Sequence, residues 1–81
     1  MIKETVTALK NGATGVELNT LCNQLSNFEC RVYIEMPNQR VNAKSLMGLI
    51  SFEFSTGDNL TLRAEGREEE KAIKVLKGFF C

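Results

Sequence analysis

An 81-residue chain with 43% hydrophobic and 25% charged residues has the composition of one folded domain, covering residues 1–81, and not of a disordered segment. Its ten basic and ten acidic residues cancel to zero net charge, so no overall field attracts nucleic acid or an anionic membrane, and no apolar run approaches the roughly 20 residues that span a bilayer. Three widely spaced cysteines, an odd number, argue against a disulfide framework and against a metal site, and favour a reducing cytoplasm.

The first half of the chain changes between strand-like and helix-like spacing. Residues 2–9 are rich in threonine and valine and partly alternate, which predicts a strand. After a turn over residues 10–13, apolar side chains recur at i, i+3, i+4 and i+7, which predicts an amphipathic helix from Thr14 onward. Its apolar stripe consists of Leu18, Leu21, Cys22, Leu25 and Phe28. A second strand then places Val32, Ile34 and Met36 on one face and Arg31, Tyr33 and Glu35 on the other.

A hairpin and a short helix are predicted next. Residues 37–38, Pro-Asn, suit a tight turn, because proline presets φ and asparagine tolerates left-handed backbone. A strand over residues 39–43 should return antiparallel to the one before it. Ser45 is expected to cap a short helix that runs through Phe52, since serine is among the best residues at that position.

The end of the chain predicts one more strand and one more helix. A turn over residues 55–58 precedes an alternating strand over residues 60–65, and Gly66 leads into the last helix. Acidic residues at its start and basic residues toward its end complement the helix dipole. Its expected buried residues are Ala72, Ile73, Val75, Leu76 and Phe79. Of the two terminal phenylalanines, Phe79 and Phe80, one is expected under the helix and the other on the surface, where it would favour weak self-association.

The predicted element order is therefore βαββαβα. Helices and strands distributed in this way indicate an α+β fold, with a four-stranded antiparallel sheet and three helices on one of its faces.

Two local features are candidates for function. Thr14 and Glu17 have the spacing of a capping box, in which each side chain accepts a hydrogen bond from the backbone of the other. On the short helix, Leu46, Met47 and Ile50 put more apolar surface than a helix of two turns can bury, which predicts a small docking patch. The alternative is that Leu46 and Ile50 belong to the core and Met47 fills a gap.

Three segments together resemble the HPr family, the small phosphocarriers of the bacterial phosphoenolpyruvate-dependent sugar phosphotransferase system. The helical stripe of residues 18–28 falls at the core positions of the family's first helix. Residues 41–48 (VNAKSLMG) look like its regulatory-serine signature, and residues 60–66 (LTLRAEG) look like its last strand and following turn. The resemblance covers residues 12–76 without a gap. It implies the open-faced β-sandwich of that family.

In HPr, a histidine that caps the first helix carries the phosphoryl group, within the pattern Gly-x-His-x-Arg-Pro-Ala. At the matching positions this chain has Thr14 for the histidine, Val16 for the arginine and Glu17 for the proline, and it contains no histidine at all. A threonine phosphate ester is far less labile than a phosphohistidine. The resemblance therefore implies a family member with no catalytic residue at the carrier position, which is not an enzyme and needs no cofactor.

The resemblance also assigns a second role to Ser45. In HPr of low-GC Gram-positive bacteria, the serine at this place is phosphorylated by a dedicated ATP-dependent kinase, and the phosphoprotein binds a transcriptional regulator of carbon metabolism. By this resemblance, Ser45 is a regulatory phosphorylation site, Leu46, Met47 and Ile50 are the docking surface, and the partners are the HPr-type serine kinase or the regulator. The alternative interpretation is that Ser45 is only a helix cap.

Three functions remain open at this point. The first is a cytoplasmic regulatory, protein-binding module of the phosphotransferase system or of carbon-metabolism control. The second is a phosphocarrier, as the family name implies. The third is a small structural or ligand-binding α+β domain without a link to sugar transport. An exposed patch at Met47 would favour the first function, and a closed surface there with a cavity elsewhere would favour the third.

Overall fold

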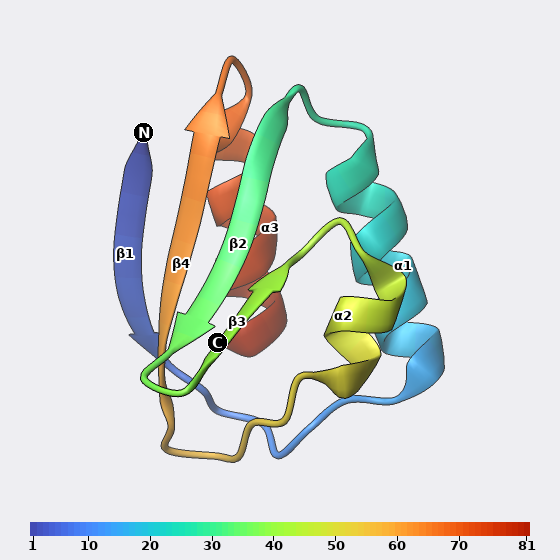
Figure 1. Cartoon of the computed structure of the whole chain (residues 1–81), viewed down its shortest axis with the longest axis vertical. Coiled ribbons are helices and arrows are strands. Elements are labelled where there is room, and N and C mark those ends of the chain that lie inside the picture. The colour runs from blue at the N-terminus through green and yellow to red at the C-terminus, as the bar shows by residue number, and fades with distance from the viewer.

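The computed structural model describes residues 1–81 and has four strands and three helices in the predicted order (Figure 1). They are β1 (Ile2–Thr7), α1 (Gly15–Ser26), β2 (Cys30–Met36), β3 (Gln39–Asn42), α2 (Leu46–Ser51), β4 (Asn59–Gly66) and α3 (Glu69–Phe80). None of the three helices combines the length and the apolar character that crossing a membrane requires.

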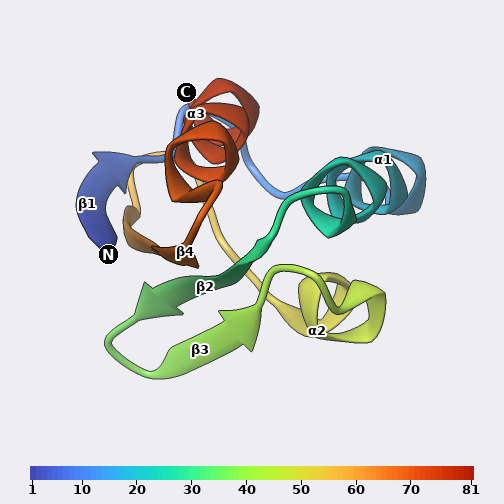
Figure 2. The same ribbon diagram turned by 90° about the horizontal axis from the view of Figure 1, so that it is seen from above.

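The strands form one antiparallel sheet in the order β1-β4-β2-β3. All three helices lie on one side of this sheet, and its other side is uncovered (Figure 2). Alternate side chains of a strand point to opposite faces of the sheet, and Leu60, Leu62 and Ala64 of β4 are fully buried on the helix side. The apolar face of the sheet is therefore the one that the helices cover. The predicted α+β fold, with its four-stranded antiparallel sheet and three helices on one face, is confirmed.

The core lies between the sheet and the helices and contains only apolar side chains. Its largest fully buried members are Leu21, Leu25, Val32, Ile34, Leu49, Leu60, Leu62, Leu76 and Phe80. The predicted stripe of α1 is buried up to Leu25. Phe28 differs, because the helix ends at Ser26, and its ring reaches the edge of the core from the following loop.

The end of β1 and the buried face of α3 differ from the prediction. β1 stops at Thr7 and not at Leu9, because the Leu9 N–H leaves the sheet and donates to the carbonyl of Phe80 at the end of α3. In α3 the buried aromatic residue is Phe80, whereas Phe79 is half-buried and lies edge-on against it. Phe80 continues the i, i+3, i+7 stripe that begins at Ile73, so the helix turns this ring toward the sheet.

Gly66 joins β4 to α3 at a point where no other residue fits well. Its φ of 143° lies in a region that L side chains avoid, and a Cβ would lie 2.7 Å from the Cα of Cys30. The close approach of β2 and β4 at this end of the sheet therefore depends on a glycine.

Candidate functional site

The first turn of α1 is closed by the predicted capping box. The Thr14 Oγ1 accepts from the N–H of Glu17 at 3.1 Å, and the N–H of Thr14 donates to the Glu17 Oε1 at 2.9 Å. The other carboxylate oxygen of Glu17, Oε2, accepts from the Lys10 Nζ at 3.1 Å. The two side chains therefore engage backbone N–H groups that a free helix N-terminus would offer to an anion.

Electrostatics strengthen this arrangement. The hydrogen bond from the Thr14 backbone, followed by that from Lys10, lowers the pKa of Glu17 below its ordinary value of 4.5. Glu17 is therefore a carboxylate at neutral pH. A phosphoryl group brought to the first turn of α1 would meet this negative charge, so the turn is suited to holding the helix and poorly suited to accepting phosphate.

Sequence reasoning did not identify the role of Lys10, which it assigned only to a turn. Its ammonium group lies 4.1 Å from the centre of the Phe79 ring in addition to its ion pair with Glu17. The contact joins the start of α1 to the end of α3. The spacing of residues in the sequence does not predict this contact, because Lys10 and Phe79 are brought together only by the fold.

Val16 occupies the second position of α1 and is 79% exposed. An apolar side chain therefore stands on the surface where the HPr pattern has an arginine. This removes a positive charge from the surface around Thr14.

Ser45 is the N-cap of α2, as predicted. Its Oγ accepts from the N–H of Gly48 at 3.2 Å. The neighbouring Lys44 does not pair with Ser45, since its Nζ donates to the carbonyl oxygen of Phe28 at 2.6 Å, just beyond the end of α1. Lys44 therefore ties the segment before α2 to α1.

The three predicted docking residues differ in exposure. Met47 is 74% exposed and Ile50 is 53% exposed, whereas Leu46 is half-buried and packs against the core. The inward face of α2 is supplied by Leu49, which is 2% exposed. The apolar surface of α2 is therefore made mainly by Met47 and Ile50, with Leu46 at its edge.

A glycine sets the position of this surface relative to the sheet. A Cβ at Gly48 would lie 2.5 Å from the Cγ2 of Val41, so only glycine allows α2 to approach β3 this closely. On its other side the segment before α2 is held by Cys22, whose Sγ donates to the carbonyl of Lys44 at 3.1 Å. Ser45 and the residues that follow it are therefore anchored to both β3 and α1.

The fold is that of an HPr-type domain: an open-faced sheet has three helices on one side, and a capped first turn of α1 and a serine-capped α2 lie at the two sites described above. Comparison of sequences agrees, since the family model described as "PTS HPr component phosphorylation site" matches residues 3–81. The chain belongs to the HPr family.

The similar proteins include both HPr-like proteins named Crh and phosphocarrier proteins named HPr. The HPr-like protein Crh of Halalkalibacterium halodurans is 32% identical over 77 residues, which cover 95% of this chain and 92% of the relative. Among solved structures, the phosphocarrier protein HPr of Bacillus anthracis is 30% identical, with a TM-score of 0.84, over 99% of this chain and 96% of the other. Crh of Bacillus subtilis, described as a domain-swapped dimer, is 33% identical, with a TM-score of 0.75, over 99% and 93%.

Proposed function

We propose that this protein is a regulatory, protein-binding member of the HPr family that carries no phosphoryl group on histidine. The observation that carries the proposal is at the first turn of α1. The chain has no histidine, and at the carrier position Thr14 and Glu17 form a closed capping box. A helix cap stands here in place of the phosphate-carrying histidine, so the protein is not expected to relay phosphate from phosphoenolpyruvate.

Ser45 is the proposed switch. A phosphate on this N-cap would lie at the positive end of α2 and within reach of its free N–H groups, a placement that favours a dianion. The apolar side chains of Met47 and Ile50, with Leu46 beside them, are exposed directly after it. Phosphorylation would therefore place two negative charges beside an apolar contact surface and change which partner binds.

The proposed partners follow from the family resemblance. An HPr-type serine kinase would modify Ser45, and a transcriptional regulator of carbon metabolism would bind the modified surface, both in the cytoplasm. The similarity to a solved structure described as that of the catabolite repression containing protein Crh supports a regulatory role. The exposure of Met47 favours a docking surface over a closed structural domain.

The test is a phosphorylation assay read by intact mass. With ATP and an HPr-type serine kinase, we expect a single phosphate on the wild type and none on Ser45→Asn. Asparagine keeps an N-cap acceptor, so the helix stays capped while the phosphorylated hydroxyl is removed. Ser51→Ala is the matched control, because Ser51 is an exposed serine at the end of the same helix. Loss of phosphate in Ser51→Ala, or its persistence in Ser45→Asn, would contradict the assignment.

A second arm tests the carrier position. With phosphoenolpyruvate and the general phosphotransferase enzyme, we expect no adduct on the wild type. An acid-labile phosphate on this protein would overturn the proposal, and it would show that the capping box of Thr14 and Glu17 does not close the site.

Self-association is a further part of the proposal. The expected apolar contribution from the terminal phenylalanines is reduced, because Phe80 is buried and Phe79 lies under the Lys10 ammonium. Support comes instead from relatives, since structures of both Crh and HPr are described as dimers. Sedimentation over a range of concentrations would detect a dimer, and a constant monomer mass up to about 1 mM would exclude it.

A further inference from the structure

The uncovered face of the sheet concentrates side chains that are typical of protein interfaces. Three of the four arginines of the chain and its only tyrosine lie there. Their neighbours Val32, Ile34, Val41, Leu62 and Ala64 point into the core on the other side, which fixes the outward direction of this set. The charged and aromatic residues of the face are Lys3, Arg31, Tyr33, Glu35, Arg40, Arg63 and Glu65. Arginine and tyrosine are among the residue types enriched in interface cores.

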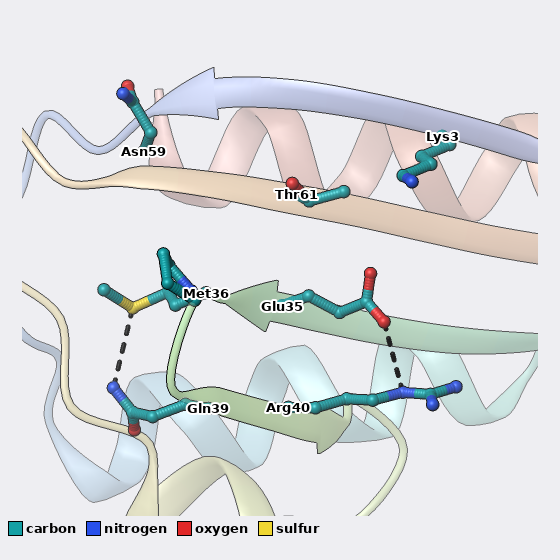
Figure 3. A pocket seen from close by; sticks show the side chains of 8 residues that line it. Lys3, Glu35, Met36, Gln39, Arg40, Asn59 and Thr61 are labelled. Atoms are coloured by element: carbon teal, nitrogen blue, oxygen red, sulfur yellow. Dashed lines mark hydrogen bonds and ion pairs between the residues drawn. The ribbon is translucent and has the colours of Figure 1, made fainter.

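A single carboxylate organises the centre of this face. The Glu35 Oε2 lies 3.2 Å from the Arg40 Nε and 3.7 Å from the Arg63 Nη1 (Figure 3 shows the pair with Arg40). The Arg40 guanidinium also lies over the Tyr33 ring, 4.5 Å from its centre. Glu35 therefore pairs with two guanidinium groups and is neutralised by them, while the Nη donors of the exposed Arg40 stay free for another acceptor.

Part of the remaining positive charge on this face is not compensated. Lys3 and Arg63 are direct partners in the antiparallel register of β1 and β4, and like charges in that position repel. The Arg63 Nε is buried without a hydrogen-bond partner. Neither Lys3 nor Arg31 takes part in an ion pair, although Arg31 lies directly across from Glu65 in the register of β2 and β4. The repulsion between Lys3 and Arg63 costs the folded protein stability, and an anionic partner bound beside these two residues would relieve it.

The shape of the face indicates how large that partner is. A shallow hollow of ≈ 410 Å³ crosses β1, β4 and the β2–β3 hairpin, and Lys3, Glu35, Arg40 and Thr61 point over it (Figure 3). Arg31 lies outside the hollow. It is four residues from Glu35 along β2, about 13 Å at the usual rise of a strand. The cations are therefore spread over a length that exceeds one small anion and corresponds to about four residues of extended peptide.

We propose that the uncovered face of the sheet binds an acidic, extended segment of a partner protein. Arg31, Arg40, Arg63 and Lys3 supply the charge complementarity, and Tyr33 supplies a rigid aromatic contact. This surface lies on the side of the sheet opposite to the helices, and so opposite to α2 (Figure 2). A partner bound here leaves Ser45 and Met47 free, and the protein can then hold two partners together.

The test uses a fluorescein-labelled decaglutamate peptide and fluorescence anisotropy at low salt. We expect saturable binding that Arg31→Glu and Arg63→Glu each weaken by about tenfold, since a reversed charge both removes an attraction and adds a repulsion. Arg31→Glu guards against a folding defect, because the Arg31 side chain is exposed and makes no ion pair. Lys74→Glu is the matched control, with the same change of charge at an exposed position of α3. It should change the affinity by less than about twofold.

Amide chemical shifts locate the peptide independently of affinity. Titration into ¹⁵N-labelled protein should move the resonances of β2 and β4, at Arg31, Tyr33 and Arg63, and leave those of α2 in place. Absence of saturable binding, equal weakening by Lys74→Glu, or shifts centred on α2 would each overturn the proposal. So would full competition by citrate, which would reduce the face to a small-anion site, or tighter binding of a labelled RNA oligonucleotide. The outcome does not depend on whether Ser45 is phosphorylated.

Discussion

Replacing Gly48 by alanine tests how tightly α2 is seated on the sheet. The new Cβ would lie 2.5 Å from the Cγ2 of Val41, whereas two carbon atoms in contact are normally about 3.5–4.0 Å apart. One of the two elements must therefore move by about 1 Å or more. Val41 is 8% exposed and belongs to the core, so it has little room to turn away.

Two opposing terms determine the size of the effect. Alanine is a better helix former than glycine by about 1 kcal/mol, which favours the variant. Overpacking of a core contact costs about 1–3 kcal/mol, which opposes it. We expect the packing term to win, so that Gly48→Ala lowers the free energy of unfolding by up to about 2 kcal/mol.

Urea unfolding of matched variants separates the two terms. Gly78→Ala is the control, because Gly78 is also helical but nothing lies within 4 Å of its added Cβ. This variant should raise the free energy of unfolding by about 0.5–1 kcal/mol. In a Val41→Ala background the clash is removed, and Gly48→Ala should then become stabilising as well. A double-mutant cycle isolates this coupling.

The result that would refute the reasoning is equal stabilisation by Gly48→Ala and Gly78→Ala. It would show that α2 is not held against β3 at this distance, and that the placement of Ser45 and Met47 does not depend on the glycine.

Three other predictions concern the helix caps and the turn at Gly66. Thr14→Ala should lower the free energy of unfolding by about 1 kcal/mol through loss of the cap acceptor, and Thr14→Ser should restore most of it; equal stability of the alanine and serine variants in urea would contradict the capping box. Because the pKa of Glu17 is lowered in the folded state, its contribution to stability is present above pH 4.5 and is lost as the pH falls through the folded-state pKa. Glu17→Gln should therefore make the free energy of unfolding depend less steeply on pH below pH 5. Part of the pH dependence should remain, since the pKa values of Glu68 and Glu69 are also lowered. Gly66→Ala should destabilise the protein by about 2 kcal/mol or more, from positive φ and the contact with Cys30, and a thermal midpoint unchanged from wild type would exclude that strain.

Local spacing was enough to predict the order of elements. Apolar side chains must leave water, and their spacing along the sequence shows which kind of element can bury them. This spacing predicted the helical stripe at Leu18, Leu21 and Leu25 and the strand alternation at Val32 and Ile34. The caps at Thr14 and Ser45 were predictable for a similar reason, because a capping interaction spans only three residues.

Element ends and side-chain depth were less predictable. Whether Phe79 or Phe80 enters the core depends on the rotation of α3 against the sheet, and the end of β1 depends on a hydrogen bond from Leu9 to the far end of the chain. The apolar residues of α2 could be named from sequence, but only packing showed that Met47 and Ile50 stay outside while Leu46 turns partly inward.

The sequence by itself determined that no histidine is available to carry phosphate and that Arg31, Tyr33 and Glu35 share one face of a strand. Only the tertiary structure brought Arg63 to Glu35, because the pairing of β2 with β4 joins residues that are far apart in the chain. It also decided that Lys10 pairs with Glu17 and lies over the Phe79 ring, and that Lys44 donates to the carbonyl of Phe28 and not to Ser45. Side-chain identity sets the chemistry that a surface can perform, whereas nonlocal packing sets which of those groups meet.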